Sequence, residues 1–273
     1  MRVPGAKAIR RIGWRLRGRL LGGGVILGYH RVADDPRGSP DPMIHPDRFR
    51  EQMSELRRDF RPTPLSGIAE ASRGRAREGL PVAVTFDDGY LDVLENALPV
   101  AEELGIPVTI FVVTGALGQS HGWDRSENAN RSGKGDPGEP APPVVGSEHL
   151  RGLAHEPLVE VGSHTVSHRA LPELPPAEAT RELLGSRRTL EDLLGRPVTR
   201  FSDPHGLVTR GLPALVEEAG YARACASGGG LVSAGSDPFL LPRVWPGDLP
   251  GPAFRKWLRS WTGRGARLPA SRW

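Results

Sequence analysis

The segment Leu80–Tyr90 constrains the fold of this chain more than any other stretch. An apolar run rich in β-branched residues ends abruptly in Asp87, Asp88 and a glycine. This pattern is typical of a buried strand that delivers acids to its carboxyl end. Because adjacent side chains on an extended backbone point to opposite sides, we expect the two acids to have different partners.

A second strand-like segment, residues 158–168, has the same design. It ends in a glycine and a serine, and His164 and His168 follow, four residues apart. If a helical turn begins there, this spacing puts both imidazoles on one face, where they can bind one cation. One carboxylate and two imidazoles leave coordination positions open for water, which is typical of a catalytic rather than a structural metal site.

The two motifs, Thr85-Phe-Asp-Asp-Gly-Tyr90 and Ser163-His-Thr-Val-Ser-His168, resemble those of the polysaccharide deacetylase family. Members of this family are metal-dependent carbohydrate esterases that remove N-acetyl groups from amino sugars. Gly28-Tyr-His-Arg-Val32 resembles the opening strand of the branch with an N-terminal Tyr-His-Arg block. Residues 183–195 resemble the family helix that follows the histidines, and residues 241–244 resemble its late strand.

Segments that read as strands and as helices alternate along the chain, which predicts a parallel sheet. The expected strands are 25–29, 82–86, 107–113, 158–161, 198–202, 221–226 and 239–244, and the expected helices are 47–60, 92–104, 177–194 and 213–219. The resemblance narrows this α/β fold to an incomplete, distorted (β/α) barrel with about seven parallel strands. Function should then lie at the carboxyl ends of the strands, where the motifs fall.

The expected organisation has three parts. A basic segment occupies residues 1–24, a polysaccharide deacetylase-like barrel residues 25–258, and a basic tail residues 259–273. Within the barrel, we expect residues 118–148 to be a flexible insertion, because 121–143 is rich in Gly, Pro, Ser and Asn and nearly free of apolar residues.

The positive charge of the chain is concentrated at its ends. Residues 1–20 contain seven basic residues and residues 255–273 contain six, with no acid in either stretch. The high pI therefore does not indicate a basic groove for nucleic acid. Residues 7–21 can form a basic amphipathic helix, so peripheral contact with an anionic membrane and a merely solvated tail both remain open.

Composition also bears on location. No stretch is long and apolar enough to cross a bilayer, and no secretory signal is recognised. The single cysteine, Cys225, excludes an internal disulfide and fits a reducing compartment. We therefore expect a cytoplasmic protein, with membrane association through the basic termini as a further expectation.

The resemblance implies a role for each motif residue. Asp88, His164 and His168 would bind a divalent metal. Two nitrogens and one oxygen suit zinc, although cobalt, nickel, manganese or iron could occupy the same site. Asp87 would be the general base that takes the proton of a water activated by the metal as it attacks the acetyl carbonyl.

His30 is the candidate general acid that protonates the leaving amine. Most of the family supplies this histidine from a late Leu-x-His motif, and this chain has no histidine after residue 205. His30, at the end of the first expected strand, can take that place, as in the branch that it resembles. His45 is the alternative.

Residues 201–206, Phe-Ser-Asp-Pro-His-Gly, match a family loop whose usual form has Tyr, Pro, Tyr and Gly. The family uses the N–H after the proline in its oxyanion hole, so His205 can still donate it. Asp203 and His205 replace aromatic residues that would shape a sugar pocket, and together they could form an additional polar contact or a second acid.

Arg243 resembles an arginine that pairs with the catalytic Asp and holds it ionised. Trp245 could offer a flat face to a sugar ring or be structural.

We therefore expect a metal-dependent hydrolase that removes N-acetyl groups from amino sugars of a glycan or glycan intermediate. One alternative is a deformylase or deacetylase of a lipid-linked sugar at the cytoplasmic membrane face, which the basic termini and the absent secretory signal favour. Another is a non-catalytic barrel that binds metal and glycan, for which the altered loop at 203–205 is the only support.

Overall fold

The structure is a computed structural model, which describes residues 23–34, 42–73, 79–120 and 141–261. Its sheet follows the order β1-β5-β6-β7-β8-β9-β10, and every neighbouring pair is parallel. These strands are β1 (Val25–Tyr29), β5 (Pro81–Phe86), β6 (Val108–Val112), β7 (Val159–Ser163), β8 (Arg200–Ser202), β9 (Arg223–Ala226) and β10 (Leu241–Pro242). The short β4 (Arg61–Pro62) pairs with β5, and β2 (Arg31–Val32) pairs separately with β3 (Met43–Ile44).

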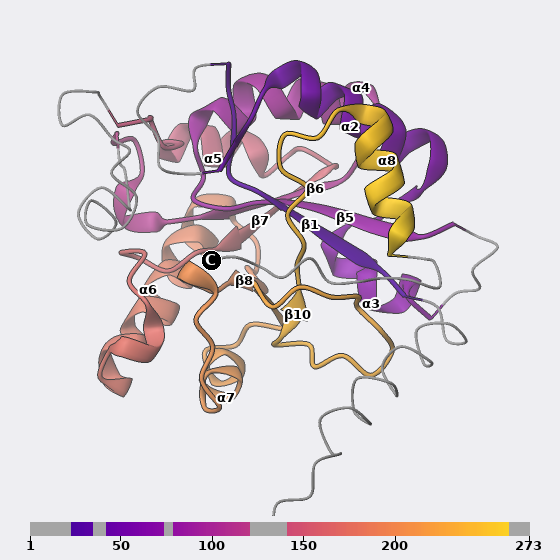
Figure 1. Cartoon of the computed structure of the whole chain (residues 1–273). Coiled ribbons are helices and arrows are strands. Elements are labelled where there is room, and N and C mark those ends of the chain that lie inside the picture. The colour runs from indigo at the N-terminus through magenta and orange to yellow at the C-terminus, as the bar shows by residue number, and fades with distance from the viewer. Residues whose placement is uncertain (1–22, 35–41, 74–78, 121–140, 262–273) are drawn as a thin grey trace, which may run out of the picture.

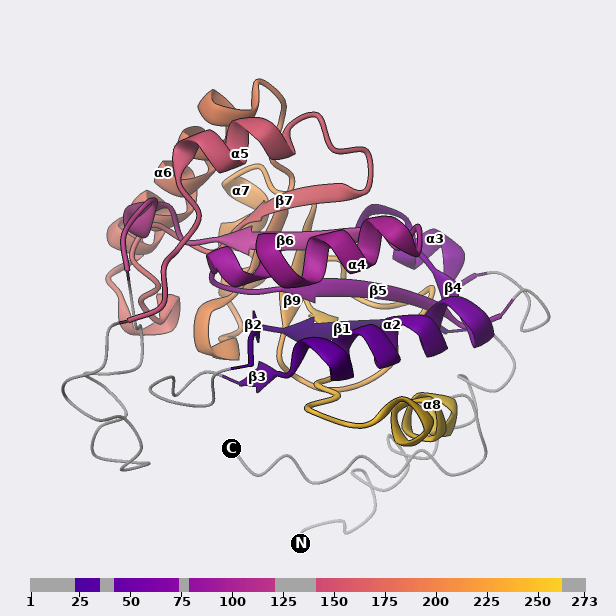
Figure 2. The same cartoon turned by 90° about the horizontal axis from the view of Figure 1, so that it is seen from above.

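Helices cover the outside of the sheet (Figure 1). They are α2 (Pro46–Asp59), α3 (Ile68–Ala71), α4 (Leu98–Glu103), α5 (Ser147–Leu153), α6 (Pro176–Leu194), α7 (Leu212–Glu218) and α8 (Gly251–Ser260). Figure 2 shows α2 and α4 running along the strands, with α8 beside α2. None of the described helices is long and apolar enough to cross a membrane.

The barrel closes through a single bridge between Leu27 in β1 and Val244, just after β10. The Gly28 N–H donates to the Val244 carbonyl and the Val244 N–H to the Ile26 carbonyl, both at 2.9 Å. Beyond this bridge, β1 and β10 share no ladder in the described part of the chain. The fold is therefore a nearly closed barrel of seven parallel strands with one unsealed seam, which confirms the predicted architecture.

Strand alternation divides the core into two parts. Val25, Leu27 and Tyr29 join a large apolar cluster that packs beneath the helices, whereas Ile26 between them joins a smaller cluster that fills the barrel interior. The other members of the interior cluster are Leu65, Ile68, Ala83, Phe111, Cys225, Val232 and Leu241.

Two strand glycines leave room for aromatic rings inside the barrel. A Cβ atom on Gly162 would lie 2.5 Å from the ring of Phe111, its register partner on β6. A Cβ atom on Gly28 would lie 2.5 Å from the indole of Trp245. Because no larger residue fits at either position without displacing a ring, these glycines determine where the two rings lie.

The observed elements differ from the expected ones in several places. The expected helix at 92–104 begins with a π-helical segment, Val93–Ala97, and becomes α4 only afterwards. Pro99 explains this, because proline cannot donate an N–H to the helix and its ring clashes with the carbonyl four residues earlier. Helix α8, which extends to Ser260 and so past the expected start of the tail at 259, was not predicted, and neither were α3, α5 and the short strands β2, β3 and β4.

Several expectations fall outside the described residues. They concern the basic helix at 7–21, most of the C-terminal tail, and residues 121–140 of the expected insertion. The flanks of that insertion are described: Ser120 forms an antiparallel bridge with Pro143, and Tyr90 forms one with Val144. The bridge to Tyr90 places the described flank at Val144 next to the turn that follows β5.

We predict that Gly162→Ala lowers the free energy of unfolding by about 1–3 kcal/mol, the usual cost of overpacking a filled core. The added methyl group would overlap the Phe111 ring inside the barrel. Gly152→Ala in α5 is the matched control, because a Cβ there meets nothing within 4 Å. Urea unfolding of both variants tests this, and equal stabilities would contradict the prediction.

Candidate metal centre and active site

The chain turns sharply where β5 ends. Asp88 and Gly89 both have left-handed backbones, with φ of 71° and 76°. The Asp87 N–H still donates to the Tyr29 carbonyl of β1 at 2.9 Å, so Asp87 continues the strand while Asp88 leaves it. The two acids have different partners, as expected, but the turn is responsible rather than strand alternation.

The two histidines reach the site through a loop, not through the helical turn considered above. His164 directly follows β7, and Thr165 and His168 are left-handed, with φ of 66° and 61°. Glu182 of α6 fixes this loop by accepting two backbone N–H bonds at 2.8 and 2.9 Å and the Ser167 hydroxyl at 2.7 Å. The expectation of a helical turn is therefore wrong, although the loop brings both imidazoles to one point.

Asp88, His164 and His168 form a compact group with one ligand atom each, all within 4.8 Å of one another. Asp88 Oδ1 lies 3.4 Å from His164 Nε2 and 3.3 Å from His168 Nε2. The Asp88 and His164 side chains are 2% exposed, and that of His168 is 10% exposed. The group lies at the carboxyl ends of β5 and β7, as the barrel architecture predicts.

The donor atoms of this group fit a divalent cation. His164 Nδ1 lies 2.8 Å from the Ser202 carbonyl, which can only accept, so Nδ1 carries a proton and, in the neutral imidazole, Nε2 keeps its lone pair. That lone pair faces Asp88 Oδ1, a buried oxygen without a hydrogen-bond partner in the described residues. Two acceptors so placed repel each other unless a positive charge lies between them.

The electrostatics of the two imidazoles differ. Burial lowers the pKa of His168 to about 3, so its imidazole is neutral and able to act as a ligand. Burial also acts to lower the pKa of His164, but the charges of Asp87 and Asp88 outweigh it and raise that pKa. The point between the acids and His164 therefore attracts positive charge.

Asp87 forms a buried, two-bonded ion pair with Arg243, which lies just after β10. Arg243 Nη1 donates to Asp87 Oδ1 at 2.7 Å, and Nη2 donates to Oδ2 at 2.6 Å. Ser202 and Thr85 accept further bonds from the guanidinium, at 2.8 and 3.3 Å. Burial alone would raise the pKa of Asp87, yet the charge of Arg243 holds it well below its usual range. Asp87 is therefore ionised at neutral pH.

Two aromatic rings flank this arginine. The guanidinium carbon of Arg243 lies 5.7 Å from the Phe111 ring centre and 5.0 Å from that of Trp245. Phe111, Ser202, Thr85 and Trp245 were not predicted to support Arg243. The sequence signal that could have identified them is their position, because each lies within three residues of a strand end.

His30 lies at the end of β1, close to both acids. Its charge would act on Asp87 and on Asp88. Its ring stacks on Trp245 with centroids 4.9 Å apart and planes 23° apart, and its Nδ1 is buried without a hydrogen-bond partner in the described residues. The alternative, His45, lies elsewhere: its Nδ1 accepts the Asp47 N–H at 3.2 Å and caps α2.

The next residue, Arg31, ties the end of β1 to the acid turn. Arg31 Nε donates to Asp92 Oδ2 at 2.7 Å, and Asp92 Oδ1 accepts the Val32 N–H at 3.2 Å. The Arg31 guanidinium also lies 5.5 Å from the ring centre of Tyr90. The segment that carries His30 is therefore bonded directly to the segment that follows the two acids.

His205 lies at the rim of the site beside His168. Its backbone is left-handed, with φ of 59°, its ring centroid is 4.7 Å from that of His168, and its Nε2 donates to the His168 carbonyl at 3.1 Å. A Cβ atom on the following Gly206 would lie 2.3 Å from Ser227, so only glycine fits there. The proposed contact of His205 with Asp203 does not form, because His205 bonds to the His168 loop instead.

Asp203 is a buried carboxyl group beside the site that has no hydrogen-bond partner for its side chain in the described residues. Its side chain is 3% exposed, and neither carboxyl oxygen has a hydrogen-bond partner in the described residues. Burial raises its pKa to about 8, although the charges of His164 and Arg243 act in the opposite direction. Asp203 is therefore mostly protonated at neutral pH.

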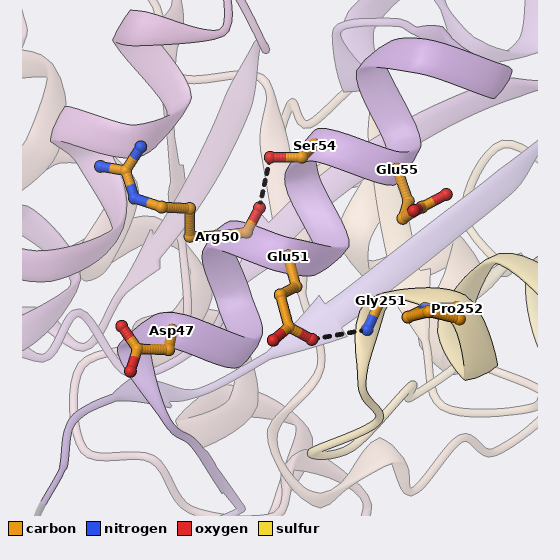
Figure 3. A pocket seen from close by; sticks show the side chains of 7 residues that line it. All are labelled: Asp47, Arg50, Glu51, Ser54, Glu55, Gly251 and Pro252. Carbon is orange, nitrogen blue, oxygen red and sulfur yellow. Dashed lines mark hydrogen bonds between the residues drawn. The ribbon is translucent and has the colours of Figure 1, made fainter.

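A surface groove between α2 and α8 contains none of these residues (Figure 3). Its lining comprises Asp47, Arg50, Glu51, Ser54, Glu55, Gly251 and Pro252. Glu51 accepts the Gly251 N–H at 2.8 Å, which stabilises the start of α8. We favour the buried cluster over this groove, because among the described residues the cluster brings buried carboxylate and imidazole ligand atoms within 4.8 Å of one another at the carboxyl ends of the strands.

Asp203→Asn should change how stability depends on pH in protein kept in chelator. The folded protein keeps the Asp203 proton up to about pH 8, whereas an unfolded Asp loses it near pH 4. Between these values the wild type loses free energy of unfolding as pH rises, by at most about 1.4 kcal/mol per pH unit. Asn cannot ionise, so the variant should lack this loss and be the more stable at high pH.

Urea unfolding of both proteins across this pH range measures the difference between the two slopes. That difference does not depend on how well the Asn amide packs, since packing shifts the stability at every pH alike. Parallel curves would show that the Asp203 pKa is not raised.

A family model for polysaccharide deacetylase matches residues 74–224, more than half of the chain. Among curated proteins, YxkH of Bacillus subtilis (strain 168), named as a polysaccharide deacetylase, is 25% identical over 181 residues, which cover 66% of this chain and 56% of that protein. The chain therefore spans a little over half the length of this relative.

Solved structures share the fold. The Streptococcus pyogenes deacetylase PplD, in complex with acetate, superposes with a TM-score of 0.68 at 19% identity, covering 88% of this chain and 99% of that one. IcaB from Ammonifex degensii gives a TM-score of 0.68 at 22% identity, covering 88% of this chain and 97% of that one. Because the family model matches more than half of the chain, and the barrel carries the aspartate and histidine motifs, the chain belongs to the polysaccharide deacetylase family.

Proposed function

We propose that the chain is a metal-dependent hydrolase that removes N-acetyl groups from amino sugars of a glycan or glycan intermediate. The observation that carries this is the buried group of Asp88, His164 and His168 beside a second carboxylate, Asp87, that is bonded to Arg243. A divalent cation held by these three residues would polarise the acetyl carbonyl and lower the pKa of a water. Zinc suits the donor set best, and cobalt, nickel, manganese or iron fit it as well.

Asp87 would act as the general base. Arg243 keeps it ionised, and each carboxylate oxygen retains a lone pair beside its bond to the guanidinium. The ion pair with Arg243 also makes Asp87 a weaker base, because the charge that keeps the carboxylate ionised lowers its pKa. Asp87 can therefore accept a proton from a water whose own pKa has been lowered, but not from an unactivated one.

His30 would protonate the leaving amine. Its place at the end of β1, where its charge acts on both acids, supports this role. Amines leave poorly unless protonated, so an imidazole that can donate a proton fits the step. The N–H of His205 would donate to the developing oxyanion, supported by the match of its loop to the family pattern and by its contact with His168.

Acetate release with added metal tests the proposal. The panel contains free, polymeric and lipid-linked N-acetyl sugars, together with an N-formyl lipid-linked sugar, for which release of formate is measured instead. Release from any of the acetylated sugars, absent in Asp87→Asn, supports the proposed activity, and the preferred member identifies the carrier. Metal-loaded protein that binds glycan but releases nothing would instead support the non-catalytic alternative.

We predict that the purified protein binds one divalent ion and that His164→Ala and His168→Ala lose it. Each substitution removes one of three protein ligands, whereas Asp87→Asn changes a residue bonded to Arg243 and should keep the ion while losing turnover. Elemental analysis of the three variants measures this. Full occupancy in either alanine variant would remove that histidine from the ligand set.

His30→Ala should keep the metal and lower the rate on N-acetyl sugars by roughly 10²–10⁴, the usual contribution of general acid–base catalysis. The loss should be far smaller on para-nitrophenyl acetate, whose leaving group needs no proton. Steady-state rates on both substrates provide the comparison. Equal losses would show that His30 does not act as the acid.

A further inference from the structure

Trp245 follows the bridge that closes the barrel and lies against the site. Its ring stacks on the His30 imidazole, with centroids 4.9 Å and planes 23° apart. It also lies where a Cβ atom on Gly28 would come within 2.5 Å of it. Gly28 lies in β1 and His30 directly follows the strand. Because they are two residues apart, they face the same side of the sheet. The glycine thus leaves the space in which the indole lies beside His30.

His30 and Arg243 both contact Trp245 but depend on it differently. Arg243 donates four hydrogen bonds, to Asp87, Ser202 and Thr85, so these bonds fix its guanidinium without the indole. His30 Nδ1 has no hydrogen-bond partner in the described residues. Histidines that transfer protons are usually oriented by a carboxylate or carbonyl at the second ring nitrogen.

We propose that Trp245 is the positioning residue of His30, and that the stacked indole does what a hydrogen-bonded partner does for other acid–base histidines. This inference rests on the proposed function. The step that it serves is a proton transfer: the His30 imidazolium gives its proton to the amine nitrogen as the C–N bond breaks, and the acetyl carbon leaves as acetate. Trp245 itself neither gives nor takes a proton.

The backbone around Trp245 is held independently of its side chain. The Val244 N–H donates to the Ile26 carbonyl at 2.9 Å. Beyond the tryptophan, Gln52 Nε2 donates to the Gly247 and Leu249 carbonyls at 2.9 and 2.8 Å, and Gln52 itself accepts the Tyr29 hydroxyl at 2.7 Å. Trp245→Ala should therefore remove the ring while leaving the strand in place.

A double-mutant cycle tests the inference. Trp245→Ala should lower kcat on the best N-acetyl sugar about ten- to hundredfold, as expected for a misplaced catalytic group. It should leave KM and metal content nearly unchanged and cost far less on para-nitrophenyl acetate. In the His30→Ala background it should cost nothing further, because residues that act as one unit are not additive. Trp245→Phe should restore part of the rate.

Gly28→Ala should disturb the same contact between Trp245 and His30 without changing either residue. The added methyl group pushes the indole away without removing it, so this variant should show the same substrate pattern as Trp245→Ala. Trp257→Ala, at a tryptophan in α8, is the control for loss of an indole elsewhere and should keep the wild-type ratio of amide to ester rates.

A second readout does not need activity. The His30 ring protons lie over the indole and should be shifted upfield in the NMR spectrum, so Trp245→Ala should move them downfield. The spectrum of His30→Ala assigns them.

The alternative role for Trp245 is to stack on the sugar ring of the substrate. Losses that appear in KM, that are equal on amide and ester, or that multiply with those of His30→Ala would overturn the inference in its favour. An unshifted His30 resonance would also overturn it. A wild-type protein without amide turnover would instead remove the proposed function, so the two failures are distinguishable.

Discussion

The buried ion pair between Asp87 and Arg243 holds the site together. It joins the end of β5 to the chain beyond β10, and Ser202 of β8 shares the same guanidinium. Taking both charges out of water costs several kcal/mol, which two short bonds and the added hydroxyl partners offset. Losing one partner would leave an unpaired buried charge, at a cost of about 3–5 kcal/mol. The pair therefore ties the barrel's geometry to the charge state of the proposed base.

The interior of the barrel is shaped to receive this pair. Phe111 and Trp245 lie on either side of Arg243, and each ring occupies space left by a glycine on a neighbouring strand, Gly162 or Gly28. Aromatic rings attract a guanidinium through their negative faces and exclude water from it. Because Trp245 also stacks on His30, the seam where the barrel closes is the place where the proposed base and acid are linked.

Local backbone strain is concentrated at the site. The non-glycine residues with positive φ in the described part of the chain are Asp88, Thr165, His168 and His205. Two of them are proposed metal ligands, and the other two lie in the loops beside those ligands. Such conformations cost of order 1–3 kcal/mol each and persist only where the surrounding structure imposes them. Here the Glu182 bonds to the histidine loop and the closely packed Gly206 supply that constraint.

Most strands and helices were predictable, because buried parallel strands and amphipathic helices have distinct periodicities. The chain's own pattern thus determined the alternating α/β order and the strand ends at which acids and histidines accumulate. Helix α8 escaped notice because the expected barrel boundary cut through it. The π-helical start before α4 could have been suspected from Pro99, which weakens the α-helical ladder.

Tertiary structure alone decided how the polar residues pair. Asp87 and Asp88 are neighbours in sequence, yet a left-handed turn sends one to Arg243 and the other to the histidines. The two histidines meet through a strained loop, not a helix, and Asp203 and His205, two residues apart in the motif, do not bind each other. Hydrogen-bond partners across a barrel are set by strand register and by which side chains fit inside. Both depend on contacts between residues far apart in the chain, which periodicity cannot encode.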